Sequence, residues 1–257
     1  MRAVAYRQFV SGYSRARSLR AALYNRVARR LAFRRPGGTT WIRVLYYHHV
    51  FDDERAGFRR QLARLANDSD FLSLDDAVEQ LRGQAPVRGR FTCVTFDDGF
   101  LNHARNAVPA LVEWKVPAAF FVPVGYLDGA AAEDFFPNGG HPPVDFLSWG
   151  DCRAMRAAGM TIGSHTVRHA RLAALTRAEA ETELRESKRR LEAELGSPCL
   201  HFAAPWGRAR DIVPDRDAAL AEEAGYHSFL TTRRGVLRDG GSAFAVPRLH
   251  AVAHWDA

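Results

Sequence analysis

Two short segments of the chain hold the side chains best suited to chemistry. Asp97 and Asp98 are adjacent carboxylates, and His165 and His169 are imidazoles with H-x3-H spacing. That spacing brings both rings to one side of a helix or a tight turn. One carboxylate and two imidazoles leave a fourth position on a zinc ion for water, as catalytic zinc sites require. The second carboxylate then remains available for proton transfer.

Each segment follows a predicted strand. The β-forming run 94–96 stops at an Asp-Asp-Gly turn in which Gly99 supplies backbone freedom, and the run 160–163 stops at Gly163. Alone, the acidic turn is typical of a solvated loop and the histidine pair of surface or capping residues. Their shared position at strand ends indicates a common site instead.

These residues resemble the motifs of the NodB-like polysaccharide deacetylases, which form carbohydrate esterase family four. Residues 95–99 resemble the first motif, and residues 165–169 resemble the second, H-[ST]-x-x-H. Residues 205–207 resemble the end of the third motif, R-x-P-[YFW]-G. The resemblance extends over residues 41–250.

The resemblance implies a distorted barrel of β/α units and one divalent metal ion, Zn²⁺ in first place with Co²⁺, Ni²⁺ or Mn²⁺ as alternatives. It implies that Asp98, His165 and His169 bind the metal and that Asp97 is the general base. Backbone N–H groups near the third motif would help to hold the oxyanion. The residues that it implies for the wall of the substrate groove are Pro205, Trp206 and Gly207.

The chain departs from the family pattern at two places. Ala203 stands where the third motif has an arginine that orients the catalytic aspartate, and Arg208 or Arg210 could replace it from beyond the motif. The late histidine that serves as general acid is assigned to His250, with His254 as the alternative. For either histidine, an ordinary place at a strand edge is the competing interpretation.

Composition indicates one soluble α/β domain. The chain has 257 residues, of which 47% are hydrophobic and 25% charged. No apolar run approaches the 18 to 20 residues that span a membrane. Cys93, Cys152 and Cys199 lack C-x-x-C spacing and are predicted to be buried free thiols, which is consistent with a reducing compartment.

The basic charge is concentrated at the N-terminus. Residues 1–51 contain eleven Arg and no acidic residue, so the rest of the chain carries −4 of the total of +7. Leucine or valine recurs every fourth residue from Leu19 to Leu31, which predicts an amphipathic basic helix within residues 1–35. We favour packing on the domain or peripheral contact with an anionic membrane over a targeting peptide.

Strands and helices alternate beyond this arm. The fold class is therefore α/β, a distorted (β/α) barrel of about seven strands, with residues 1–40 as a basic arm and 41–257 as the catalytic domain. The loop 128–144 is expected on the active face, as a surface insertion or a substrate lid. The predicted strands are 42–47, 92–96, 118–122, 161–163, 200–203, 227–231 and 244–249. The predicted helices are 56–66, 74–82, 104–114, 149–158, 177–195 and 215–224.

The function expected from these features is removal of an N-acyl group, in first place N-acetyl, from an amino sugar in a surface or extracellular polysaccharide or its lipid-linked precursor. The alternatives are a catalytically impaired glycan-binding module of the same fold and a deformylase of a lipid-linked amino sugar. Nucleic-acid binding by the arm is weakly supported and is not expected. The missing secretory signal favours a cytoplasmic location, peripheral at the inner membrane face, and the oligomeric state stays open.

Overall fold

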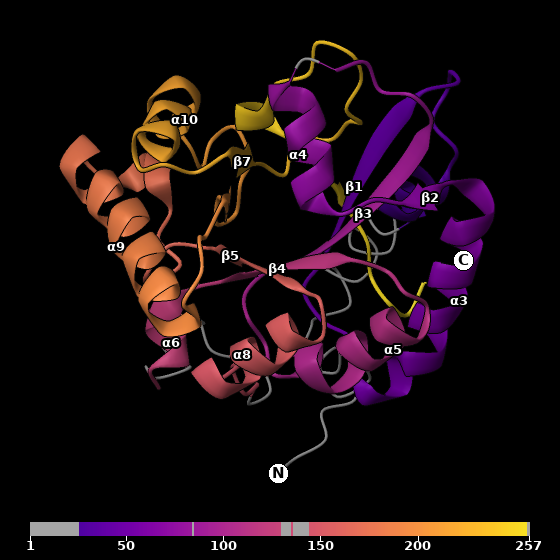
Figure 1. The fold of residues 1–257 in the computed structure, drawn as a ribbon, viewed down its shortest axis with the longest axis horizontal. Helices are drawn as coiled ribbons and strands as arrows, with labels where there is room; N and C mark the ends of the chain where they lie inside the picture. Colours follow the sequence, from indigo (N-terminus) through magenta and orange to yellow (C-terminus); the bar gives the residue numbers. More distant parts are fainter. Residues whose placement is uncertain (1–25, 84, 130–134, 136–143, 256–257) are drawn as a thin grey trace, which may run out of the picture.

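A computed structural model describes residues 26–83, 85–129, 135 and 144–255. Its strands form a parallel sheet in the order β7-β6-β5-β4-β3-β1-β8, with β2 paired beside β3. Figure 1 shows that these strands follow an arc, so that the sheet is a curled half-barrel. This confirms the predicted distorted barrel of about seven strands. The strands are β1 (Trp41–Tyr47), β2 (Asp70–Phe71), β3 (Arg90–Phe96), β4 (Ala118–Val122), β5 (Thr161–Ser164), β6 (His201–Ala203), β7 (Ser228–Leu230) and β8 (Leu249–His250).

Helices connect the strands and cover the outer side of the arc (Figure 1). Their bounds agree with the predicted helices to within three residues, except that 104–114 is divided into a π-helical turn and an α-helix. The α-helices are α3 (Arg55–Asp68), α4 (Leu74–Arg82), α5 (Val108–Glu113), α6 (Val124–Leu127), α8 (Trp149–Ala157), α9 (Arg177–Leu195) and α10 (Pro214–Glu223). The short turns are η1 (Asp52–Glu54), η2 (His103–Ala107), η3 (Leu172–Ala174) and η4 (Ala243–Ala245).

Helix α9 illustrates how the sequence sets an element. Thr176 and Glu179 form a capping box at its start, which satisfies two backbone donors that a helix leaves unpaired. Gly196 ends the helix in the left-handed conformation, with φ of 62°. The helix is thereby fixed beside β5, where its buried Glu183 reaches the histidine segment.

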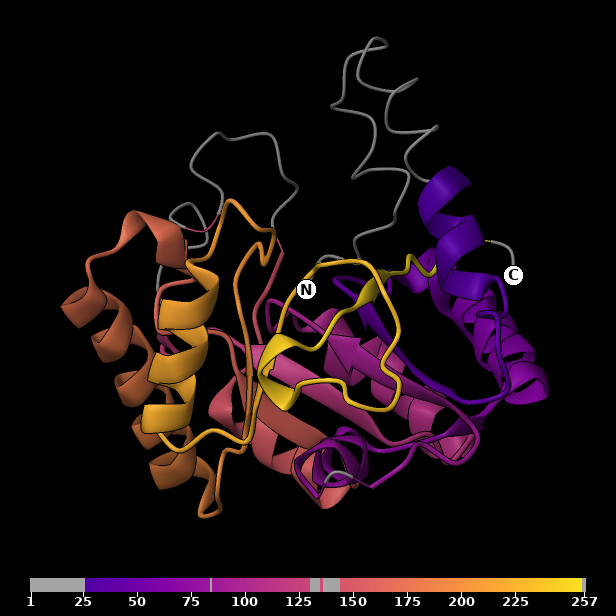
Figure 2. The ribbon, with the colours of Figure 1, turned by 90° about the horizontal axis from the view of Figure 1, so that it is seen from above.

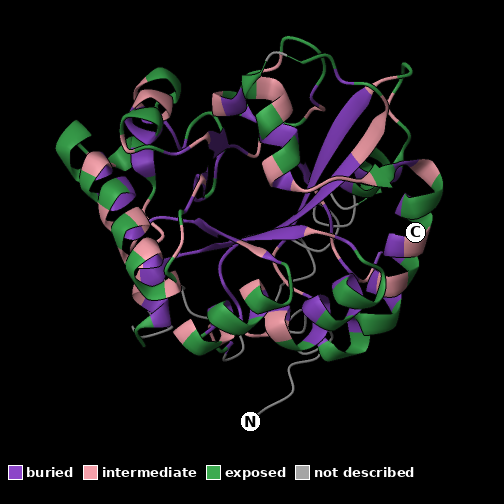
Figure 3. Cartoon of the chain, in the orientation of Figure 1, coloured by how far each residue is buried: buried purple, intermediate pink, exposed green. Residues whose placement is uncertain are grey.

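Apart from the short β2, the strands are largely buried on both faces (Figure 3), and side-chain alternation divides their residues between two cores. The outer core lies between the sheet and the surrounding helices, and includes the strand residues Leu45, Tyr47, Val94, Phe96, Phe120, Phe202 and Phe229. The inner core fills the concave side, and includes Ile42, Val44, Cys93, Ala119, Phe121, Ala203 and Leu230.

Helix α4 closes the concave side of the half-barrel. Leu74, Ala77 and Val78 belong to the inner core, together with Leu237 and Val246 from the C-terminal part of the chain. Figure 1 shows α4 between the two ends of the arc. The interior is therefore packed with side chains, as in closed barrels of this type.

A helix at residues 26–33 packs on the same domain. Ala28, Ala32 and Phe33 are buried in the outer core, whereas Val27 and Leu31 are 41% and 39% exposed. The prediction that leucine and valine form the packing face is therefore wrong for this helix. The small Ala28 and Ala32 side chains allow a closer approach to the domain instead. Residues 1–25 of the predicted arm lie outside the described residues, and the division at residue 40 stays a prediction.

The predicted strand 244–249 is wrong over most of its length. Residues 243–245 form η4, Val246 makes only an isolated bridge with Leu230, and regular pairing begins where β8 lies beside β1 at Leu249. Ser242 caps η4 by accepting a hydrogen bond from the Phe244 N–H, and Pro247 has no N–H to donate to a neighbouring strand. Figure 2 shows the C-terminal segment, in yellow, crossing from the side of α10 to the side of α3.

Most of the loop 128–144 lies outside the described residues, although Phe135 and Val144 are described and buried. Cys93, Cys152 and Cys199 are buried free thiols, as predicted. None of the described helices is long and apolar enough to cross a bilayer.

Candidate active site

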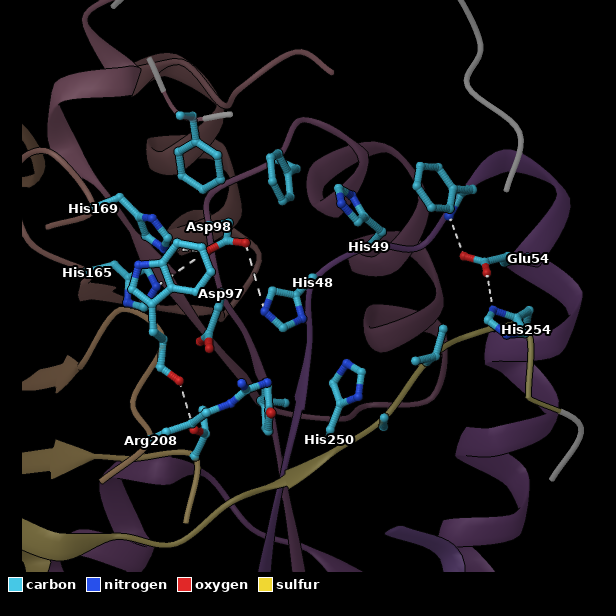
Figure 4. A pocket seen from close by; sticks show the side chains of 18 residues that line it. His48, His49, Glu54, Asp97, Asp98, His165, His169, Arg208, His250 and His254 are labelled. Atoms are coloured by element: carbon cyan, nitrogen blue, oxygen red, sulfur yellow. Dashed lines mark hydrogen bonds and ion pairs between the residues drawn. The ribbon is translucent and has the colours of Figure 1, made fainter. Parts of the chain in front are cut away.

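The candidate site lies where several parallel strands end. Asp97 and Asp98 follow β3, His165 follows β5, and His48 follows β1. Because parallel strands run the same way, their carboxyl ends meet at one edge of the sheet. Figure 4 shows these side chains converging on one pocket.

A sharp turn sends the two carboxylates in different directions. Asp98 and Gly99 both have positive φ, 76° and 66°. The Asp97 N–H donates to the Tyr47 carbonyl at 2.9 Å, which continues the pairing of β3 with β1 up to the turn. A Cβ at Gly99 would lie 3.2 Å from Val122 Cγ1, so the position suits glycine on both counts. Asp97 then points to the interior and Asp98 to the histidine pair (Figure 4).

Asp98, His165 and His169 form the only group of potential metal ligands found among the described residues. Asp98 Oδ1 lies 3.4 Å from His165 Nε2 and 3.2 Å from His169 Nε2. Metal–ligand bonds of about 2.0–2.1 Å in a tetrahedral site separate neighbouring ligand atoms by about 3.3 Å. The donor set and its spacing therefore fit a divalent cation such as zinc.

His165 is held in the tautomer that a metal needs. Its Nδ1–H donates to the Ala203 carbonyl at 2.7 Å, which leaves the lone pair on Nε2, the atom that faces Asp98. Outer hydrogen bonds of this kind orient metal-binding histidines. Burial lowers the pKa of His169, which favours the neutral ring and a lone pair for a metal.

The histidine segment is a strained turn rather than a helix. Thr166 and His169 have φ of 67° and 55°, a region that non-glycine residues rarely adopt. Glu183 of α9 holds the turn by accepting hydrogen bonds from the Val167 N–H at 2.8 Å and the Arg168 N–H at 3.1 Å. Backbone strain of this kind persists where the surroundings enforce it, commonly at functional sites.

Arg248 is the residue that orients Asp97. Its guanidinium is fully buried and donates two hydrogen bonds to the carboxylate, NH1 to Oδ1 at 2.7 Å and NH2 to Oδ2 at 2.8 Å. Further hydrogen bonds to the Thr231 carbonyl and to Thr95 Oγ1 fix the guanidinium plane. The arginine missing at Ala203 is thus replaced from a different part of the chain, and the two substitutes considered from sequence, Arg208 and Arg210, are wrong.

Different partners keep each of the two carboxylates ionised. Burial alone would raise the pKa of Asp97, but the charge and hydrogen bonds of Arg248 outweigh burial and hold that pKa below its usual value. Burial likewise opposes ionisation of Asp98, yet the charge of His48 and hydrogen bonds from His165 and His169 hold its pKa well below the usual range. Both groups are therefore carboxylates at neutral pH.

His48 and His250 lie beside the acidic pair. His48 Nε2 is 3.9 Å from Asp98 Oδ2, the oxygen turned away from the other two histidines, and the His48 and His250 ring centroids are 5.5 Å apart. Burial lowers the pKa of His250 to about 3. His103 positions the backbone of this segment, since its Nε2–H donates to the His48 carbonyl at 2.7 Å.

Of the residues 205–207 predicted for the pocket wall, Trp206 lines the pocket, whereas Pro205 and Gly207 do not. Trp206 is 53% exposed and lies 5.5 Å from the His169 ring between centroids. The Arg171 guanidinium lies over its ring at 5.3 Å. Gly207 has φ of 60°, and a Cβ there would lie 2.9 Å from the Thr232 backbone nitrogen. This turn therefore fixes the exposed indole at the rim of the pocket.

The structure brings together most residues selected from sequence. Asp97, Asp98, His165 and His169 share one pocket with His250 and His254, although His254 is grouped with Glu54 at a distance from the ligand set (Figure 4). Sequence reasoning gave no role to Arg248, His48, Glu54, His103 or Glu183. Of these, His48 could have been found by the rule already applied to Asp97, because it directly follows a predicted strand.

The sequence also matches a known protein family. The family model described as polysaccharide deacetylase matches residues 84–229, which is more than half of the chain. The chain therefore belongs to the polysaccharide deacetylase family. The matched region contains the acidic turn, the histidine segment and the Trp206 turn.

A curated relative agrees with this assignment. The chain is 25% identical over 156 residues to "Putative polysaccharide deacetylase YxkH" of Bacillus subtilis (strain 168), a match that covers 61% of this chain and 50% of the relative. The chain thus spans half the length of the curated relative that it matches.

Solved structures show the same fold. IcaB from Ammonifex degensii is 26% identical with a TM-score of 0.72, and the match covers 82% of this chain and 92% of that one. The deacetylase PplD of Streptococcus pyogenes, solved in complex with acetate, is 21% identical with a TM-score of 0.71, covering 84% and 95%. At this lower identity the likeness shows the fold alone.

Proposed function

We propose that this protein is a metal-dependent hydrolase that removes an N-acyl group, in first place N-acetyl, from an amino sugar of a polysaccharide or its lipid-linked precursor. The observation that carries the proposal is the division of labour between two adjacent carboxylates. Asp98 faces two histidines at ligand spacing, while Asp97 faces away from them and is held by Arg248. Family membership supports the carbohydrate substrate.

In this proposal Asp98, His165 and His169 hold one divalent cation, for which zinc suits the mixed nitrogen and oxygen donors. Co²⁺, Ni²⁺ and Mn²⁺ accept the same donors. A cation bound there would lower the pKa of water and polarise the amide carbonyl.

Asp97 accepts the proton of the attacking water. Its depressed pKa keeps it ionised at neutral pH, and the two hydrogen bonds from Arg248 fix the direction of its oxygens. A positioned general base contributes about 10²–10⁴-fold to the rate. Arg248 acts on the reaction through Asp97 and is therefore a positioning residue.

The departing amine needs a proton, and we propose His250 as its donor, with His254 as the alternative. His250 lines the same pocket as Asp97 and Asp98. Burial lowers its pKa, so the ring is neutral in the resting protein and must take up a proton during the reaction before it can donate one. We further propose that Trp206, with Pro205 and Gly207, forms the wall that receives the sugar, since an exposed indole suits the apolar face of a pyranose.

The acyl group and its sugar are tested by a release screen. Purified zinc-loaded protein would be incubated with N-acetylated and N-formylated amino-sugar oligomers, and released acetate and formate measured separately. We expect acetate release that stops with a chelator and returns with zinc. Formate as the sole product would instead identify the deformylase alternative, and a metal-loaded protein that releases neither acid would favour the glycan-binding module.

The contact between Arg248 and Asp97 weighs against the alternative of a catalytically impaired glycan-binding module. That alternative was motivated by Ala203, and the structure supplies the missing guanidinium from Arg248. The motive for expecting lost catalysis is therefore weakened.

We also infer that helix 26–33 contacts an anionic membrane surface. Its exposed residues are Val27 and Leu31 with Arg26, Arg29 and Arg30, and the exposed Arg34 and Arg35 follow directly after it. Each basic residue near such a surface contributes about 1 kcal/mol, and two apolar side chains can enter the headgroup region. Co-sedimentation with vesicles containing phosphatidylglycerol, but not with neutral phosphatidylcholine vesicles, is expected. A cytoplasmic location at the inner membrane face stays a prediction.

A Leu31→Glu variant tests this contact. It should lose sedimentation without a change in the melting temperature, because the side chain is exposed. An Arg185→Ala variant is the matched control, since Arg185 is an exposed arginine on α9 that is paired with Glu181. Equal sedimentation of the wild type with both kinds of vesicle would contradict the contact.

A further inference from the structure

The pocket extends well beyond the candidate metal site. Its volume is about 460 Å³, which lies in the range that buries whole drug-sized ligands and exceeds what an acetamido group requires. Trp206 and Arg208 line it near the histidine pair, whereas Glu54, Val252 and His254 line it elsewhere. Figure 4 shows Glu54 and His254 on the far side of His48 and His250 from Asp98.

Glu54 and His254 form a hydrogen-bonded pair at this second end of the pocket, in which Glu54 is buried and His254 is partly exposed. Glu54 is 3% exposed, and its Oε1 lies 2.9 Å from His254 Nδ1. Its Oε2 accepts a hydrogen bond from the Phe51 N–H at 2.9 Å. Because Nδ1 donates to a carboxylate, the neutral His254 ring carries its lone pair on Nε2, and the protonated ring carries a donor there. The pair can therefore exchange hydrogen bonds with hydroxyl groups.

The pair is not needed to anchor the C-terminal segment, because the neutral side chain of Gln61 already anchors it. Gln61 of α3 is fully buried, and its amide donates to the Val252 carbonyl at 2.8 Å and the Trp255 carbonyl at 2.6 Å. Tyr47 in turn donates to Gln61 Oε1 at 3.0 Å. Burying a carboxylate is costly even when it is hydrogen bonded, so the buried Glu54 carboxylate that lines a pocket is better explained by recognition of a ligand.

We propose that Glu54 and His254 form a second subsite, which binds hydroxyl groups of the sugar next to the one that loses its acyl group. The ligand class is a neutral, hydroxyl-rich saccharide, because the pair combines a hydrogen-bond acceptor with a ring that can donate or accept. Tyr46 and Val252 also line the pocket and contribute apolar surface to it. This inference rests on the proposed function and adds to it a preference for oligomers over single sugars.

The test compares substrates of different length. KM and kcat would be measured for N-acetylglucosamine and for its trimer and pentamer, with the zinc-loaded wild type and a His254→Asn variant. We expect the wild-type KM to fall about tenfold or more from monomer to pentamer, and the variant to lose this gain with length. Glu54→Gln, which keeps an acceptor for the Phe51 N–H, should act in the same direction. Melting temperatures of both variants confirm that they are folded.

The outcomes separate the subsite from the proposed function. A variant that retains the full gain with length overturns the subsite while leaving the deacetylase intact. If His254 serves only as a proton donor, kcat falls equally for all lengths and the gain persists, which also overturns the subsite. His227→Asn, at a histidine outside the pocket lining, is the control and should behave as the wild type.

Binding gives a readout independent of turnover. Calorimetric titration of chelator-treated wild type with the pentamer should show binding that His254→Asn weakens about tenfold. A wild type that binds the pentamer but releases no acid would count against the proposed function alone. Equal affinity of the wild type and the variant would count against the subsite.

Discussion

Arg248 and Asp97 are joined by two parallel hydrogen bonds inside the half-barrel, although they are 151 positions apart in the chain. The arginine comes from the segment just before β8, and the aspartate from the end of β3. Ala203, at the place where the family motif has its arginine, is fully buried in the inner core. The same carboxylate can thus be oriented by an arginine from a different part of the chain.

Replacing Arg248 by Met should abolish most activity without removing the metal. The buried carboxylate of Asp97 would lose its only charged hydrogen-bond donor among the described residues, and we expect kcat to fall about 10²-fold or more. Zinc content, measured by mass spectrometry, should stay at one ion per chain. Arg248→Lys keeps the charge but lacks the planar fork, so it should recover only part of kcat. Loss of zinc in Arg248→Met would show that the arginine supports the ligands instead.

Transplanting the arginine tests whether the two positions are equivalent. The side chain of Ala203 points to the same interior as Arg248, so Arg248→Ala would leave space there for a guanidinium. We expect Ala203→Arg in the Arg248→Ala background to raise kcat at least about tenfold above that of the single variant. Ala203→Arg alone should lower the melting temperature, because two guanidinium groups would then be buried together. A double variant no more active than Arg248→Ala would contradict this equivalence.

The proton donor can be identified from the leaving group. An amide needs a proton on its departing nitrogen, whereas 4-nitrophenyl acetate has a leaving group that departs without one. We expect His250→Asn to slow amide hydrolysis about 10²-fold while ester hydrolysis changes much less. His48→Asn is the comparison, since that ring is 5.5 Å from His250 and nearer to Asp98. The same selective loss in His48→Asn, with His250→Asn unaffected, would assign the proton to His48.

Sequence and structure agree best where local signals suffice. The strand before Asp97 and the helix over residues 177–195 were predictable, because β-forming runs, capping residues and a terminal glycine are local features. The grouping of the candidate metal ligands was predictable because strand ends of parallel units meet at one edge. Local reasoning failed where position depends on distant parts of the chain. The pairing of Arg248 with Asp97 requires the C-terminal segment to cross the barrel. The exposure of Leu31 depends on how closely the small Ala32 side chain lets the helix at residues 26–33 approach the domain.

A histidine network at the opposite ends of the strands should make stability depend on pH. His201 of β6 hydrogen bonds to Asp75 of α4 at 3.1 Å and to Ser228 of β7 at 2.9 Å. The hydrogen bond from His201 lowers the pKa of Asp75 from 3.8 to about 2. A carboxyl whose folded pKa is depressed stabilises the protein above its unfolded pKa, and this contribution is lost as pH falls from about 4 towards 2.

An Asp75→Asn variant should therefore be less stable than the wild type at pH 7 by about 1 kcal/mol, after discounting for the partial exposure of the side chain. Urea unfolding at pH 7 and pH 3 measures the difference in free energy. We expect the difference to shrink at pH 3. A difference of equal size at both pH values would contradict the pKa shift as its cause.

The central claim is that neighbouring carboxylates have different tasks, Asp98 as a metal ligand and Asp97 as a base. It is tested most directly by measuring zinc content and N-acetyl release together in Asp97→Asn and Asp98→Asn, which remove the same charge from adjacent positions. We predict that Asp97→Asn keeps one zinc ion per chain and loses turnover, whereas Asp98→Asn loses the zinc itself. Full turnover in Asp97→Asn, or unchanged zinc in Asp98→Asn, would contradict the assignment.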